Sequence, residues 1–60
     1  LRLEAMNIRL TGELEQYYHV EYRTHVQNIG WQSWVRDGAM AGTSGKSLRL
    51  EALQIRLVRK

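Results

Sequence analysis

The sequence of 60 residues predicts an all-β fold: an antiparallel repeat unit of about three strands, or four with the N-terminal strand. Three observations predict this fold. The middle of the chain alternates between apolar and polar residues, glycine-containing turn signals separate the segments, and a long stretch of sequence occurs twice. Because repeat units of this kind pack on one another, we expect a β-prism-like or propeller-like symmetric assembly.

The internal repeat is the strongest of these signals. Residues 1–10 read LRLEAMNIRL and residues 48–57 read LRLEALQIRL, so eight of ten positions match at an offset of 47 residues. We interpret residues 1–10 as the C-terminal strand of a preceding repeat, 11–16 as a polar connector, and 17–60 as one complete repeat within a longer protein. One unit of such an array does not bury its apolar face alone, which predicts a homo-oligomer.

The elements of the repeat follow from local patterns. Residues 17–28 alternate, with mainly apolar even positions and mainly polar odd positions, as in a half-buried strand. A tight connection at 28–30 and an Asp-Gly turn at 37–38 enclose a second strand over 31–36. Residues 39–47 are small and rich in glycine, which is typical of a loop.

The last predicted strand covers residues 48–58. Its apolar residues change parity at Ala52, which predicts a β-bulge or a bend at that position. The same segment is rich in good helix formers, but we prefer a strand because the rest of the unit is β. The residues expected in the structural core are Trp31, Val26, Leu50 and Ile55.

The composition excludes several classes of function. The net charge is +3, but the basic residues are scattered and often stand beside acids, which predicts a solvated mixed surface and no nucleic-acid site. No apolar run approaches the roughly 20 residues of a membrane span. With no cysteine and two histidines, we expect no metal site and no cofactor.

Catalysis is not expected either. The chain has no cysteine nucleophile, and nothing in the sequence indicates a Ser-His-Asp arrangement. Sixty residues do not readily hold two carboxylates across a cleft, as a glycosidase requires. We therefore predict that the protein is not an enzyme.

Three stretches in order, HVQNIGW at 25–31, WVRDG at 34–38 and AGTSGKSLRLEA at 41–52, resemble the clostridial hydrophobic repeat with a characteristic tryptophan, the ChW repeat. The resemblance covers residues 17–57 and a tail of a previous copy at 1–10. Such repeats occur in tandem in secreted and surface proteins of clostridia, and beside wall-degrading domains that include phage lysins.

What the resemblance implies is targeting or adhesion. The expected function is a non-catalytic module, extracellular or attached to the cell surface, that binds cell-wall polysaccharide or peptidoglycan through several copies at once. The alternative is a protein–protein adhesion or oligomerisation scaffold of a bacterial surface protein.

The candidate ligand-binding residues surround two tryptophans. Trp31 and Trp34 have opposite parity, so we place Trp31 in the core and Trp34 on a face that could stack on a sugar ring. The alternatives are a structural histidine at position 25, and an ion pair between Arg49 and Glu51 across repeats. The candidate site consists of Trp34, Gln32, Asn28, His25, Asp37 and Arg49.

Overall fold

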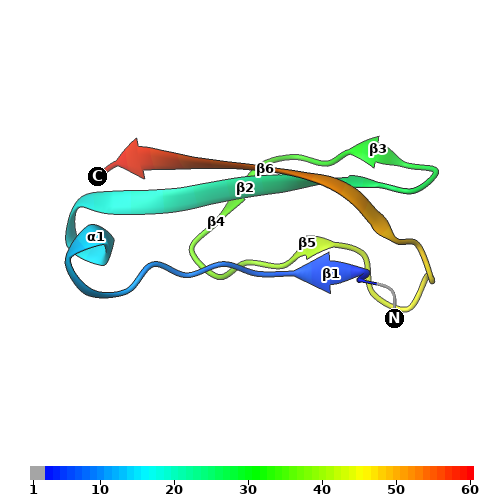
Figure 1. Ribbon diagram of the computed structural model, residues 1–60, viewed down its shortest axis with the longest axis horizontal. Helices are drawn as coiled ribbons and strands as arrows, with labels where there is room; N and C mark the ends of the chain where they lie inside the picture. The colour runs from blue at the N-terminus through cyan, green and yellow to red at the C-terminus, as the bar shows by residue number, and fades with distance from the viewer. Residues whose placement is uncertain (1–2) are drawn as a thin grey trace.

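The computed structural model describes residues 3–60, which form two layers of antiparallel strands joined by one short helix within that range (Figure 1). One layer is a four-stranded sheet, and the other is a two-stranded sheet. In chain order the elements are β1 (Ala5–Met6), α1 (Gly12–Tyr17), β2 (Tyr18–Val26), β3 (Gly30–Trp31), β4 (Val35–Arg36), β5 (Ala41–Gly42) and β6 (Leu50–Arg59).

Strand β2 is the centre of the larger sheet. It pairs with β6 from Tyr18 to Val26, and it pairs at separate positions with β3 and with β4. Every pairing is antiparallel. The prediction of an all-β antiparallel fold is therefore confirmed, and within residues 3–60 the sheets do not close into a barrel or a propeller.

The predicted strand over residues 31–36 is interrupted. Trp31 lies opposite His25 and Val35 lies opposite Tyr22, so this segment advances four residues while β2 goes back three. The extra residue reverses the alternation between β3 and β4. The parity argument that placed the two tryptophans on opposite faces is wrong for this reason.

The parity change in the last strand has the predicted cause. His25 pairs with Ala52 and Val26 pairs with Leu50, which leaves Glu51 as the extra residue of a β-bulge in β6. The segment is a strand of ten residues, so the helical alternative does not apply.

The connector is a short helix where we expected a loop. Helix α1 has six residues, and Glu13 and Glu15 lie in its first turn, where negative charge is favourable. It ends where Tyr18 enters the extended conformation of β2. No helix in residues 3–60 has the length and apolar character needed to cross a membrane.

The N-terminal segment covers the sheet instead of extending it. Strand β1 pairs with β5, which lies inside the predicted loop 39–47, and the two form the separate smaller sheet. Backbone hydrogen bonds continue this contact, from Gly38 N–H to Ile8 O and from Leu50 N–H to Leu3 O. Of the predicted strand 1–10, residues 1–2 lie outside the described residues.

The core lies between the two layers. Val20, Tyr22 and Ala41 are buried together, and the Tyr22 hydroxyl donates a hydrogen bond to the carbonyl of Ala39. Val26 is fully buried as well, and Leu50 is half-buried. The partly buried residues that pack against the core cluster are Met6, Ile8, Leu10 and Val35.

Two residues expected in the core lie at the surface. The exposed fraction is 42 % for Trp31 and 54 % for Ile55. Trp31 lies opposite His25, on the face of the sheet that points away from the core. Ile55 lies opposite the buried Tyr22, so it points to the core side. It remains exposed because the N-terminal segment packs over β2 and does not cover Ile55 on the neighbouring strand β6.

Close approach of β1 and β5 depends on Gly42. Its φ is +100°, and a Cβ added there would lie 2.4 Å from the carbonyl oxygen of Glu4. We expect Gly42→Ala to lower the free energy of unfolding by about 2–3 kcal/mol, because backbone strain adds to the clash. Urea denaturation measures this change.

The matched control is Gly45→Ala. Gly45 also has a positive φ, of +74°, but an added Cβ would meet nothing within 4 Å. This variant carries only the backbone strain, so its expected cost is about 1 kcal/mol. Equal costs for the two variants would contradict the role of close packing at Gly42.

Candidate functional site

The face of the larger sheet that points away from the core carries an alternating series of aromatic and cationic side chains. The guanidinium carbon of Arg23 lies 4.9 Å from the ring centroid of Trp31 and 5.0 Å from that of Trp34. The guanidinium carbon of Arg56 lies 3.9 Å from the Trp34 ring. We call Trp31, Arg23, Trp34 and Arg56 the tryptophan–arginine ladder.

Four strands position this ladder. Arg23 stands at an odd position of β2, opposite in phase to the buried Tyr22, and Arg56 projects from β6 on the same face. Trp31 comes from β3, and Trp34 directly precedes β4. Each contact falls within the range in which a cation is attracted to the face of an indole.

A carboxylate anchors one end of the ladder. Glu21 is nearly buried, and it accepts hydrogen bonds from Arg36 Nε at 3.1 Å and from Arg56 Nε at 2.7 Å. The hydrogen bond from Arg36, then that from Arg56, holds the pKa of Glu21 below its ordinary value of 4.5. Glu21 therefore fixes the position of Arg56 beneath Trp34 and offsets part of the positive charge.

The other end of the ladder continues through His25. Its ring meets Trp31 edge to face, with 5.3 Å between centroids, and its Nδ1 lies 3.1 Å from Glu51 Oε1. Glu51 is the extra residue of the bulge, and its second oxygen lies 3.9 Å from Arg49 Nε. Among the predicted candidates, His25 therefore joins the ladder through Trp31, and Glu51 links His25 to Arg49. The ion pair between Arg49 and Glu51 lies within one repeat.

The prediction of a core position for Trp31 is wrong. Trp31 is exposed, and Trp34 is half-buried between two arginines on the same face of the sheet. Trp31 is consequently the aromatic side chain of the ladder with the larger surface for a ligand.

Three predicted candidates lie outside the ladder. The Gln32 side-chain oxygen accepts hydrogen bonds from Gly42 N–H at 2.8 Å and from Thr24 Oγ1 at 3.4 Å, so it joins the two layers. Asn28 is an exposed turn residue with a φ of +66°. Asp37 is held by His19 Nδ1 at 2.5 Å and by Val20 N–H at 3.1 Å.

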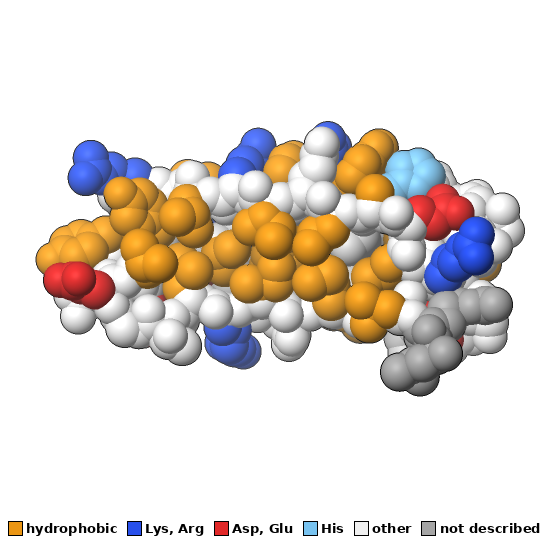
Figure 2. Space-filling view, in the orientation of Figure 1, with side chains coloured by type: hydrophobic (Ala, Val, Ile, Leu, Met, Phe, Trp, Pro, Cys, Tyr) orange, Lys and Arg blue, Asp and Glu red, His pale blue; other side chains and the backbone are white. Residues whose placement is uncertain are grey.

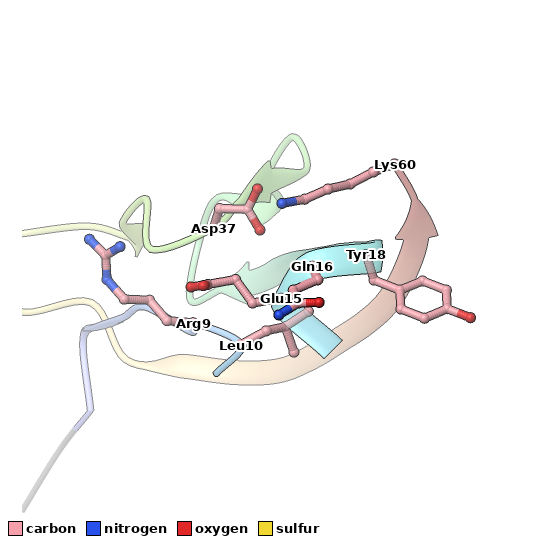
Figure 3. A pocket seen from close by; sticks show the side chains of 7 residues that line it. All are labelled: Arg9, Leu10, Glu15, Gln16, Tyr18, Asp37 and Lys60. Carbon is pink, nitrogen blue, oxygen red and sulfur yellow. The ribbon is translucent and has the colours of Figure 1, made fainter. Parts of the chain in front are cut away.

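Asp37 also belongs to a pocket of about 330 Å³ near the C-terminus (Figure 3). Its wall carries charges of both signs, and residues 9–10, α1 and the C-terminal Lys60 contribute to it. Among the described residues, no group of three His, Asp or Glu side chains could hold a metal ion. The pocket is lined by Arg9, Leu10, Glu15, Gln16, Tyr18, Asp37 and Lys60.

Two ladder residues were missed by the sequence analysis. Arg23 could have been found, because it stands two positions before His25 on the polar side of an alternating strand. Arg56 could not, because its position depends on the register in which it lies opposite Glu21. The arginines were expected to be scattered, yet Arg23, Arg36 and Arg56 gather on one face, where Glu21 pairs with the last two.

The carboxyl groups of the site predict a pH dependence of stability. Hydrogen bonds lower the pKa of Glu21 below 4.5 and that of Asp37, mainly through His19, below 3.8. A carboxyl whose pKa is lower in the folded chain stabilises the fold above its unfolded pKa, and this contribution is lost as the pH falls through the folded pKa. We expect the free energy of unfolding to decrease in that acidic range.

Glu21→Gln is expected to make the decrease smaller, because the variant has no carboxyl to protonate at that position. Urea denaturation at a series of acidic pH values measures the slope. Gln54→Ala, which changes the same face without removing a carboxyl, should keep the full slope. An unchanged slope in Glu21→Gln would contradict the assignment.

Comparison with known proteins agrees with the motifs that run through this site. The family described as Clostridial hydrophobic W (ChW) matches residues 25–59, which is more than half of the chain and includes three of the four ladder residues, Trp31, Trp34 and Arg56. No curated protein and no solved structure matches the chain. ChW repeats are found in surface proteins of clostridia. The chain belongs to the Clostridial hydrophobic W family.

Proposed function

We propose that the chain is a non-catalytic targeting module that binds cell-wall polysaccharide or peptidoglycan outside the cell, as part of a bacterial secreted, surface or phage-lysin protein. The observation that carries the proposal is the exposed ring of Trp31, which is flanked by Arg23 and His25. An apolar ring beside hydrogen-bonding groups suits a sugar, which has an apolar face and a rim of hydroxyls.

The polar side of the proposed contact comes from Arg23. Its Nε–H is donated to Gln54 Oε1 at 2.7 Å, and a guanidinium has further N–H donors for a ligand. Among the described residues, no carboxylate forms a salt bridge with Arg23, in contrast to Arg36 and Arg56. Its charge would also favour wall polymers that carry carboxylate or phosphate groups.

Binding by one such surface is expected to be weak, since the ladder lies on an open sheet face. Copies arranged in a β-prism-like or propeller-like assembly would present several ladders to one polymer, and the joined sites would bind far more tightly than each alone. The homo-oligomer or tandem array is therefore part of the proposal.

A protein–protein scaffold is the second candidate. It is favoured by the apolar side chains of β6, which are exposed on the opposite face of the sheet from the ladder. The two candidates use different surfaces, so substitutions can separate them.

Retention on purified clostridial cell walls tests the first candidate. Trp31→Ala is expected to weaken binding at least about tenfold, ~1.4 kcal/mol, because the stacking surface is lost. Trp34→Ala should weaken binding indirectly, through the two arginines, since Trp34 is half-buried and holds them in place.

Tyr17→Ala is the matched control. Tyr17 is an aromatic residue with an exposed fraction of 55 %, and α1 lies at the opposite end of the molecule from β3 (Figure 1). This variant should bind walls like the unmodified chain. Undiminished binding by a folded Trp31→Ala chain would overturn the ladder as the site, and no wall binding by the folded unmodified chain would favour the scaffold.

A further inference from the structure

Strand β6 presents an apolar row that nothing in the described chain covers. The exposed fractions of Leu53, Ile55 and Leu57 are 42 %, 54 % and 48 %. They lie opposite Thr24, Tyr22 and Val20, so they point to the same side of the sheet as the core. Figure 2 shows hydrophobic side chains in a continuous band along the long axis of the molecule.

The internal repeat gives each member of this row a counterpart. At the offset of 47 residues, the row corresponds to Met6, Ile8 and Leu10. Those three residues are the ones of the N-terminal segment that pack against the buried core. One sequence therefore occurs in two settings, with its apolar residues partly buried in the first and exposed in the second.

We propose that the row Leu53, Ile55 and Leu57 docks onto the core of a second copy of this repeat unit. In that contact it would lie against the second copy's Val20, Tyr22 and Ala41 as the N-terminal segment does here. The proposed contact has a counterpart within the chain, because residues 3–10 occupy the same position on the sheet of residues 17–60.

The backbone of β6 is suited to the same contact. In the N-terminal copy, the carbonyl oxygens of Leu3, Glu4 and Ile8 accept hydrogen bonds from the unit that it covers. Within residues 3–60, β6 is paired as a strand only with β2, so its other edge has no strand partner. The strand can remain paired in its own sheet while its apolar row fills the neighbour's core.

This contact explains why the row is exposed in a single chain. The core of the chain is already covered by its own N-terminal segment, so a second 60-residue chain has no open core to offer. A tandem copy without its own covering segment does have an open core. The contact joins two different surfaces, the row of one copy and the core of the next. Repeat units that are joined in this way form either an open series or a closed ring.

The test compares the 60-residue chain with a longer chain in which residues 1–57 are followed directly by a second copy of residues 11–60. In the longer chain, the row of the first copy is the covering segment of the second. Ile55→Ala in the first copy should raise the unfolding equilibrium constant about tenfold there, and less than about twofold in the 60-residue chain. Urea denaturation followed by circular dichroism measures both.

Two further variants make the comparison specific. Ile8→Ala in the 60-residue chain replaces the counterpart of Ile55 and calibrates the expected tenfold effect. Gln54→Ala changes the opposite face of β6 and should have the same effect in both chains. If Ile55→Ala has equally small effects in both chains, the proposal is overturned, whether or not the ladder binds cell walls.

Discussion

The whole fold depends on the cover that residues 3–10 place over the apolar face of β2. A sheet with one apolar face needs a second layer, and a unit of this size has few residues left to build one. Here β5 supplies part of that layer through Ala41, and Met6, Ile8 and Leu10 supply the rest. The core of the repeat is therefore completed by a segment that, by its sequence, repeats the end of the unit.

Because one face of β2 is covered, the opposite face carries its polar side chains. Because the apolar residues of β2 point to the cover, its alternate positions carry Glu21, Arg23 and His25 outward. Two irregularities then assemble the ladder. An extra residue between β3 and β4 places Trp34 on the same face as Trp31, and the bulge at Glu51 brings a carboxylate to His25. The ladder therefore depends both on the regular alternation of side chains along β2 and on these two interruptions of it.

Local patterns in the sequence were sufficient for β2, for β6 with its bulge, and for the turns that follow β2 and β4, since each depends on neighbouring residues. They failed where a feature depends on a partner strand. The side of Trp34 follows from the register between β2 and β4, and the exposure of Ile55 follows from the limited reach of the cover. Helix α1 was missed because a segment of six residues, with Leu14 and Tyr17 as its large apolar side chains, is too short to show a helical period.

The position of the cover at the start of the chain affects how the protein is made. A ribosome synthesises residues 3–10 before any part of the sheet that they protect, so the cover is available when β2 emerges. Strand β6 is made after β1 to β5, yet it pairs with β2 from Tyr18 to Val26. The sheet is thus incomplete until β6 has been made, while its apolar face already has a partner in the nascent chain, which limits the exposure that leads to aggregation.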